Sequence, residues 1–283
     1  MMGEEGYVIG VDSGSTYTKG VVMQLDGRIV ATDITMTGIR ILESANRLYR
    51  TLLEKAGLSE SDVAYVVGTG YGRYQITFGH VQVTEISAHG LAAHYLFPRT
   101  HTVLDMGGQD TKAIRINDKG EVIDFAMNDK CAAGTGRFIE AAARALGLDL
   151  RQASEIALNA RRPVKITSTC TVFAETEVLE HLAAGERLED ILYGAYLGIA
   201  TRSVGLLRRV GVEPEVTFQG GVSLNKGMVK AVEETLHMKV NTSPLTMYGG
   251  AIGAALYGIK QLTGKEEIVM PTADRAPREV ESA

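Results

Sequence analysis

The stretch Tyr7-Val-Ile-Gly-Val-Asp-Ser-Gly-Ser-Thr16 is an apolar run that ends in an aspartate and passes into a short polar segment. A second apolar run follows at residues 20–25, then an Asp-Gly turn and a third run at residues 28–34. Short apolar runs separated by glycine-bearing turns are typical of antiparallel strands joined by hairpins. The sequence therefore predicts a three-stranded meander, followed by a helix at residues 43–57 that ends at Gly57.

The same plan recurs in the stretch Thr102-Val-Leu-Asp-Met-Gly-Gly-Gln-Asp-Thr-Lys112. A gapless alignment at one constant offset matches polar and glycine positions as well as apolar ones: Asp12 with Asp105, Gly14 with Gly107, Thr18 with Thr111, Lys19 with Lys112, and Gly27 with Gly120. Two unrelated meanders would explain the strands but not these matches. The pattern indicates an internal duplication, with two α/β lobes that each open with a hairpin carrying an aspartate at a strand end.

Composition limits the class of protein. The chain has 283 residues, 45% of them hydrophobic, and a net charge of −5, which argues against nucleic-acid binding as its main activity. No apolar run is long enough to span a bilayer, and the N-terminus lacks a signal-peptide pattern, so we expect a cytoplasmic protein without a membrane segment. Neither a dinucleotide-binding fingerprint nor a P-loop is present.

Two features of the duplicated plan suit a nucleotide. A strand beginning at Val216 runs into Gly220-Gly221 ahead of a helix at residues 225–236, and such a diglycine lets the backbone approach a ligand, here adenosine. Hydroxyl and backbone N–H groups in the two hairpins can cradle phosphates, as anion-binding nests do. The residues concerned are Ser13, Gly14, Ser15 and Thr16 in the first hairpin, and Gly107, Gly108 and Gln109 in the second.

We expect the charged and amide side chains of the hairpins to have different roles. Asp12 and Asp105 are expected to hold Mg²⁺ through water rather than to touch phosphate, because like charges repel and Mg²⁺ keeps several of its waters. Gln109 is placed to orient a water that attacks the γ-phosphate. For Lys19 two interpretations stay open: it offsets phosphate charge, or it is a solvated hairpin lysine.

The chain has two cysteines, Cys131 and Cys170, and each stands shortly before a segment with a helical pattern. The positive end of a helix favours the thiolate form of a cysteine. Two-fold symmetry would bring together four thiolates, which is the ligand set of a [4Fe–4S] cluster. Taken alone, however, each cysteine is better explained as a small buried side chain than as a cluster ligand.

Several motifs together resemble the activators of 2-hydroxyacyl-CoA dehydratases, in the ATPase group that also includes benzoyl-CoA reductase subunits. The resemblance extends to about residue 260. The motifs are Gly10-Val-Asp-Ser-Gly-Ser-Thr, Thr69-Gly-Tyr-Gly-Arg, Asp105-Met-Gly-Gly-Gln-Asp, Met127-Asn-Asp-Lys-Cys-Ala-Ala-Gly-Thr-Gly-Arg-Phe, Ser168-Thr-Cys-Thr-Val-Phe-Ala-Glu and Gly249-Gly-Ala-Ile-Gly-Ala-Ala-Leu-Tyr. Gln219, before the diglycine, departs from the smaller residue expected there.

The resemblance implies an actin-like fold of the acetate and sugar kinase, heat-shock 70 and actin superfamily (RNase H-like), with a nucleotide cleft between two lobes. Residues 1–98 would form the first lobe, completed by a C-terminal helix near residues 245–262. Residues 99–244 would form the second lobe, with both cysteines, and residues 263–283 a disordered tail. Within the motifs, Gly134, Gly136 and Gly250 are expected to contact the nucleotide.

The resemblance also implies a function. The protein would be a homodimer with one bridging [4Fe–4S] cluster, held by Cys131 and Cys170 of each chain. It would bind ATP or ADP with Mg²⁺, accept electrons from ferredoxin or flavodoxin, and pass single electrons to an iron–sulfur acyl-CoA dehydratase. A benzoyl-CoA-type reductase or a double-cubane-cluster protein is an alternative acceptor. A cluster-free small-molecule kinase and an actin-type regulator are the competing classes.

Overall fold

The structure is a computed structural model that describes residues 6–128, 134–167, 170–268 and 270. The chain divides into two compact units, each with its own sheet. Unit 1 comprises Met1–Arg99, Asn117–Glu121 and Tyr248–Ala283, and unit 2 comprises Thr100–Ile116 and Val122–Met247. The C-terminal part of the chain therefore belongs to the same unit as the N-terminal part.

The sheet of unit 1 has the strand order β3-β2-β1-β4-β5. The predicted meander is present as an antiparallel set, and β4 and β5 extend it in parallel on the other side of β1. The strands are β1 (Tyr7–Ser13), β2 (Tyr17–Gln24), β3 (Ile29–Met36), β4 (Val63–Thr69) and β5 (Val81–Gln82).

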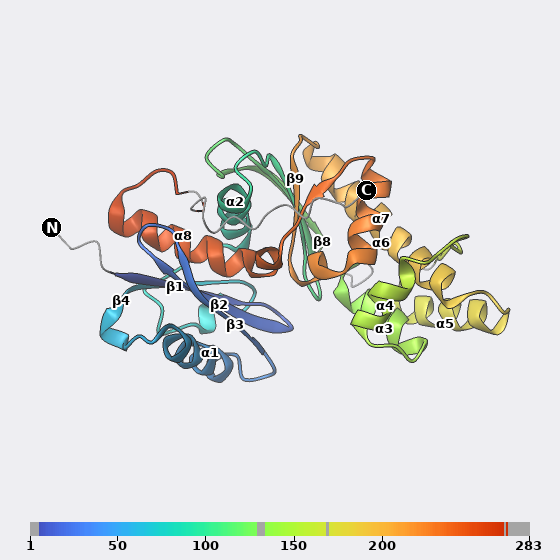
Figure 1. Cartoon of the computed structure of the whole chain (residues 1–283), viewed down its shortest axis with the longest axis horizontal. Coiled ribbons are helices and arrows are strands. Elements are labelled where there is room, and N and C mark those ends of the chain that lie inside the picture. Colours follow the sequence, from blue (N-terminus) through green and yellow to red (C-terminus); the bar gives the residue numbers. More distant parts are fainter. Residues whose placement is uncertain (1–5, 129–133, 168–169, 269, 271–283) are drawn as a thin grey trace. The chain divides into compact units, whose positions relative to one another are not determined.

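Helices cover both faces of this sheet (Figure 1). Successive side chains of a strand point to opposite faces. Ile9 and Val11 of β1 pack in one apolar cluster with Leu48 of α1, whereas a β-carbon on Gly10 would strike the backbone of Ala251 in α8. The helices of unit 1 are α1 (Ile41–Ala56), α2 (Glu85–Leu96) and α8 (Gly249–Thr263). The small residues of α8 thus allow this close packing.

Unit 2 repeats the arrangement. Its sheet order, β10-β9-β6-β7-β8, matches that of unit 1 strand for strand when read from β8. The register repeats as well, because Asp12 lies opposite Lys19 across β1 and β2, and Asp105 lies opposite Lys112 across β6 and β7. The strands are β6 (Thr102–Met106), β7 (Thr111–Ile116), β8 (Val122–Asn128), β9 (Val216–Gln219) and β10 (Val240–Asn241). The duplicated fold is confirmed.

A large apolar core fills unit 2. The long helix α6 packs on β6, β7 and β8, and α7 packs on α6. Tyr196 and Phe218 are among the largest fully buried side chains in this core. The helices are α3 (Gly136–Ala145), α4 (Leu150–Ala157), α5 (Thr171–Ala183), α6 (Leu188–Val210) and α7 (Lys226–Leu236). Helix α4 was not predicted. It starts at a capping box in which Asp149 and Gln152 bond each other's backbone N–H groups.

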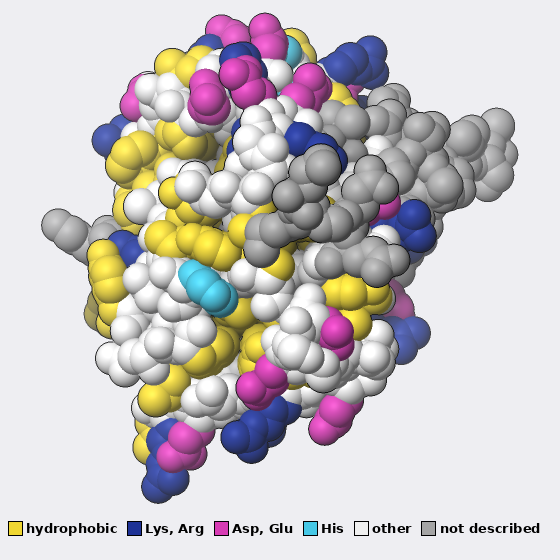
Figure 2. All heavy atoms as spheres, turned by 90° about the vertical axis from the view of Figure 1, so that its left-hand side faces the viewer, with side chains coloured by type: hydrophobic (Ala, Val, Ile, Leu, Met, Phe, Trp, Pro, Cys, Tyr) yellow, Lys and Arg dark blue, Asp and Glu magenta, His cyan; other side chains and the backbone are white. Residues whose placement is uncertain are grey.

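Four short 3₁₀ segments complete the described elements: η1 (Glu60–Asp62), η2 (Arg73–Gln75), η4 (Gly221–Leu224) and η5 (Pro244–Tyr248). In the part of the chain that the structure describes, no helix is long and apolar enough to cross a membrane. Figure 2 shows one face of the molecule, where apolar side chains form a band and acidic and basic side chains gather together at its edges.

Candidate functional site

The β1–β2 hairpin in unit 1 contains two buried hydroxyl oxygens with nothing to bind. Among the described residues, Ser13 Oγ and Thr16 Oγ1 have no hydrogen-bond partner. The backbone around them is tied down, since the Gly14 carbonyl accepts from Thr37 Oγ1 at 2.8 Å and the Thr16 carbonyl accepts from the Thr37 N–H at 3.0 Å. Buried polar groups are normally hydrogen-bonded. Two ordered donors without partners fit the phosphate-binding role expected of Ser13, Gly14, Ser15 and Thr16.

Asp12, at the end of β1, is 7% exposed and is flanked by two glycines. A β-carbon on Gly250 of α8 would lie 2.5 Å from Asp12 Oδ2, and one on Gly70, after β4, would strike Asp12 Oδ1. Gly70 also has a φ of +91°, a conformation that only glycine adopts at low cost. Both carboxylate oxygens are therefore approached by backbone. Lys19 is half-buried on β2 opposite Asp12.

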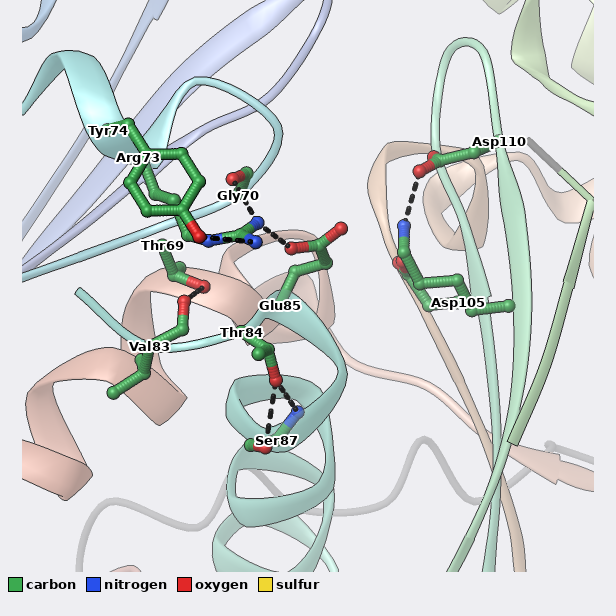
Figure 3. A network of polar contacts seen from close by, with 11 residues as sticks. Thr69, Gly70, Arg73, Tyr74, Val83, Thr84, Glu85, Ser87, Asp105 and Asp110 are labelled. Carbon is green, nitrogen blue, oxygen red and sulfur yellow. Dashed lines mark hydrogen bonds and ion pairs between the residues drawn. The ribbon is translucent and has the colours of Figure 1, made fainter. Parts of the chain in front are cut away.

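Asp105, the equivalent residue in unit 2, is 3% exposed. The buried ammonium of Lys112 lies 3.3 Å from Asp105 Oδ2 and 2.5 Å from Asp110 Oδ2. Figure 3 shows the contact between this ammonium and Asp110. The Asp105 carboxylate is thus charge-compensated within unit 2.

The diglycine turn after β9 takes the place in unit 2 that Gly70 has in unit 1. Gly220 has a φ of +85°, and a β-carbon there would lie 2.6 Å from Asp105 Oδ1. Its carbonyl accepts from Ser223 Oγ at 2.7 Å, and its N–H donates to the Thr246 carbonyl at 3.2 Å. Gly221 begins η4. Gln219, the residue that departs from the expected smaller one, is fully buried on β9 opposite Asp105.

The β6–β7 hairpin is bonded to the start of α3. The Gly107 carbonyl accepts from the Gly136 N–H at 2.9 Å, and the Gly108 carbonyl accepts from the Arg137 N–H at 3.0 Å. With its amide oxygen turned toward α3, Gln109 accepts from Arg137 Nη2 at 2.6 Å. Thr111 Oγ1 donates to the Gly134 carbonyl at 2.5 Å. The predicted phosphate-binding residues of unit 2 are therefore joined to the helix that follows Cys131 in sequence.

The structure describes only one of the two cysteines, Cys170. Cys131 lies outside the described residues. Cys170 is exposed, is not in a disulfide, and is the N-cap residue of α5, where its carbonyl accepts from the Ala174 N–H at 2.9 Å. An exposed sulfur at a helix start fits a ligand role, and a buried apolar role for Cys170 does not fit.

Sequence reasoning missed part of this arrangement. Gly70 received no role of its own beyond its place in the Thr69-Gly-Tyr-Gly-Arg motif, although its place after β4 repeats the place of Gly220 after β9. Lys112 was recognised as a repeat position but not as the partner of Asp105. The aspartate at 110 was not singled out at all. A signal was available for Gly70, because aligning the fourth strand of each lobe brings the two glycines into register.

The comparisons with known proteins identify the family. The model of the BadF/BadG/BcrA/BcrD ATPase family matches residues 9–258. The chain belongs to the BadF/BadG/BcrA/BcrD ATPase family. Within it, the chain is 40% identical over 256 residues to the (R)-2-hydroxyglutaryl-CoA dehydratase activating ATPase of Acidaminococcus fermentans, covering 90% of this chain and 98% of that relative.

Solved structures agree with this assignment. The activator of the 2-hydroxyisocaproyl-CoA dehydratase from Clostridium difficile, solved with bound ADPNP, matches with a TM-score of 0.86 and 37% identity, covering 91% of this chain and 96% of that one. A glucokinase of the ROK family from Streptomyces griseus matches with a TM-score of 0.58 at 14% identity, covering 89% and 99% of the two chains. The second likeness shows the fold alone. Members of the BadF/BadG/BcrA/BcrD ATPase family thus share the actin-like fold with sugar kinases.

Proposed function

We propose that this chain is an ATP-dependent one-electron donor that activates an iron–sulfur acyl-CoA dehydratase. The ATPase family and the activating role of a relative at 40% identity support the proposal. The observation that carries it is the pair of hydrogen bonds from Gly136 and Arg137 to the β6–β7 hairpin. They join residues assigned to the nucleotide with the helix that follows a predicted cluster ligand.

In the proposed nucleotide site each unit supplies one hairpin. Ser13 and Thr16 donate their buried hydroxyls to phosphate oxygens, and the backbone N–H groups of Gly108 and Gln109 do the same from unit 2. The predicted contacts at Gly134 and Gly136 lie beside this second hairpin. Gly220 and Gly221 leave room for adenosine.

The proposed acid residues have distinct environments. Asp12 holds Mg²⁺ through its waters. Asp105, whose charge is balanced by Lys112, takes part in holding this Mg²⁺ through its waters, and Gln109, held by Arg137, orients the attacking water. Lys19, opposite Asp12, offsets phosphate charge.

Cys131 and Cys170 of two chains are the proposed thiolate ligands of one bridging [4Fe–4S] cluster in a homodimer. When bound, such a cluster supplies single electrons at low potential. The N–H groups at the start of α5, where Cys170 is the N-cap residue, would stabilise its negative charge. Exchange of ATP for ADP at the hairpin changes the hydrogen bonds at the start of α3. We expect that change to shift α3, the helix that follows Cys131 in sequence, and such a shift would make electron transfer directional. Reduced ferredoxin or flavodoxin is the proposed donor.

The decisive measurement is the content of iron and acid-labile sulfide after anaerobic purification, with the mass of the assembly determined in parallel. We expect about four irons per dimer, because four thiolates hold one cubane cluster. A colourless, iron-free protein that still binds ATP would overturn the electron-donor proposal and favour a kinase-like function.

Two variants separate the two halves of the proposal. Cys170→Ala should remove the iron and leave ADP affinity unchanged. Asp105→Asn should keep the iron and slow ATP hydrolysis by at least about a hundredfold, because a carboxylate that helps to hold the metal ion is lost. Full iron in the first variant would refute the ligand assignment, and undiminished turnover in the second would refute the role of Asp105. Reduction assays with a dehydratase and with a benzoyl-CoA-type reductase then identify the acceptor.

A further inference from the structure

Gly70 and Gly250, the two glycines that flank Asp12, are each connected through further contacts to the helix α2. On the first path, the Gly70 carbonyl accepts from Arg73 Nη1 at 3.2 Å, and the same nitrogen donates to Glu85 Oε2 at 2.9 Å (Figure 3). Glu85 is the first residue of α2. The side chains of Arg73 and Glu85 are only 22% and 18% exposed, so solvent screens this ion pair less than a surface pair.

The second path runs through α8. Gly250, in its first turn, lies against Asp12 Oδ2. One turn further along α8, a β-carbon on Gly253 would strike the carbonyl of Ala88 in α2. Backbone therefore packs directly on backbone where α8 crosses α2. The position of Gly250 is set by the same helix that anchors Arg73.

The segment between β4 and α2 is also fixed at both ends. The Gly72 N–H donates to the Ser13 carbonyl at 2.8 Å, which holds the turn on the residue next to Asp12. Thr69 Oγ1 donates to the Val83 carbonyl at 3.0 Å, and Thr84 caps α2 by accepting from the Ser87 N–H at 3.2 Å (Figure 3). Arg73 is the one side chain in this network that bonds both the turn and the helix.

We propose that Arg73 and Glu85 are a positioning pair for Asp12: through Gly70 they fix the rotamer of the carboxylate that holds the nucleotide-associated divalent cation. This inference rests on the proposed function for the role of Asp12. Without the guanidinium, the Gly70 carbonyl keeps its bond from the Arg73 N–H, at 3.2 Å, but loses its connection to Glu85 and α2, so the turn can move off Asp12 Oδ1. Removing a residue that orients a metal ligand without touching the metal itself typically lowers metal affinity by 10- to 100-fold.

The test compares Arg73→Met, Arg73→Lys and Glu85→Gln in the full-length protein. The first readout is the affinity of the ADP-bound protein for Mn²⁺ by equilibrium dialysis. The second is the Mg²⁺ concentration that gives half-maximal ATP hydrolysis, with kcat measured separately. Arg73→Met should weaken Mn²⁺ binding by about tenfold and raise the Mg²⁺ requirement equally. Arg73→Lys should recover most of this, because one ammonium can reach both acceptors.

A matched control is Arg28→Met, which removes an exposed ion pair with Asp26 on the β2–β3 turn of the same unit. It should leave both readouts at the wild-type value. Thermal unfolding midpoints separate positioning from stability. If Arg73→Met lowers the midpoint but leaves Mn²⁺ affinity and the Mg²⁺ requirement unchanged, the pair is only structural and the proposal is wrong.

A different result would show that the proposed function itself is wrong. A wild-type protein that binds neither nucleotide nor Mn²⁺ would overturn the proposed function together with this inference. A wild-type protein with a Mg²⁺-dependent ATPase activity that Arg73→Met leaves intact would overturn the positioning pair alone. Should Arg73→Met not fold, Glu85→Gln decides, since it removes one charge and keeps the side-chain shape.

Discussion

Gly220 lies directly against the carboxylate of Asp105: a β-carbon on Gly220 would be 2.6 Å from Asp105 Oδ1. The same carbon would also strike the Met106 carbonyl, and the residue has a φ of +85°. The end of β9 and the end of β6 are therefore packed together without room for any side chain. Only glycine satisfies both the space and the backbone conformation.

We predict that Gly220→Ala costs about 1–3 kcal/mol of stability through backbone strain alone. It should also weaken ADP binding by at least about tenfold, because displacement of a binding group by a fraction of an ångström disturbs the whole site. Gly185→Ala is the matched control in unit 2, since Gly185 has a φ of +82° and open space around it. It should lose stability and keep ADP affinity. Equal ADP affinities in the two variants, measured by titration calorimetry, would contradict the prediction.

Lys112 compensates two carboxylates from a buried position. The Lys112 and Asp105 side chains are 4% and 5% exposed, whereas Asp110 is 29% exposed. Removing one partner of a buried ion pair leaves the other charge in a poor solvent, which costs about 3–5 kcal/mol. Lys112→Met should therefore lower the free energy of unfolding by that amount in urea denaturation.

Two further variants test the cause. Lys112→Met combined with Asp105→Asn should recover part of the lost stability, because the neutral amide needs no counter-charge. Asp110→Asn should cost less than about 1 kcal/mol, since Lys112 keeps Asp105 as its counter-charge and the pair with the more exposed Asp110 contributes little. If the double variant is no more stable than Lys112→Met, the loss comes from packing and not from charge.

Most of the fold could be predicted from the sequence because the duplication repeats polar residues at fixed places. Asp12, Lys19 and the hairpin glycine recur in unit 2, and their register across the strands recurs with them. The ends of helix α6, at 188 and 210, can be predicted from the sequence, because its apolar spacing is long and regular. Short elements such as β5 and β10 carry only two residues each, too few for any periodicity.

The candidate site was less predictable, because much of it consists of backbone contacts between distant segments. No local pattern places Gly70 against Asp12, or Gly136 against the Gly107 carbonyl, since these pairs meet only when the sheet has formed. The role of Arg73 likewise depends on Glu85, at the start of a different element. The assignments of ligands and nucleotide contacts stay predictions.

His94 makes the stability of unit 1 depend on pH. Burial lowers the pKa of His94 below its usual value of about 6.5, and Lys260 lowers it further, while Glu267 and Asp118 raise it in part. The unfolded chain thus binds a proton at a pH where the folded chain does not, so stability falls as pH falls from about 6.5 toward the lowered pKa. We expect the thermal midpoint to be lower at pH 5.5 than at pH 7.5.

Substituting this histidine should reduce that dependence. His94→Gln keeps a polar group of similar size and cannot be protonated, so the difference in midpoint between the two pH values should shrink. His237→Asn removes an exposed histidine at the end of α7, where asparagine tolerates the left-handed backbone. It should leave the difference as in wild type. A wild-type-like difference in His94→Gln would rule out burial of this imidazole as its source.

Backbone hydrogen bonds join the β6–β7 hairpin to α3, and the side chains of Arg137 and Gln109 add a further hydrogen bond between them. If the hairpin binds phosphate, ADP should slow hydrogen exchange at the amides of residues 136–145, because the Gly107 and Gly108 carbonyls then hold the helix start more firmly. Arg137→Met should reduce that protection by roughly tenfold, since a hydrogen bond to a charged group contributes about 1.5 kcal/mol. Arg144→Met, an exposed change in the last turn of the same helix, should not affect it.

Hydrogen exchange followed by mass spectrometry, with and without ADP, distinguishes these outcomes. An ADP effect on α3 that is the same in Arg137→Met and in wild type would mean that the backbone bonds alone carry the connection.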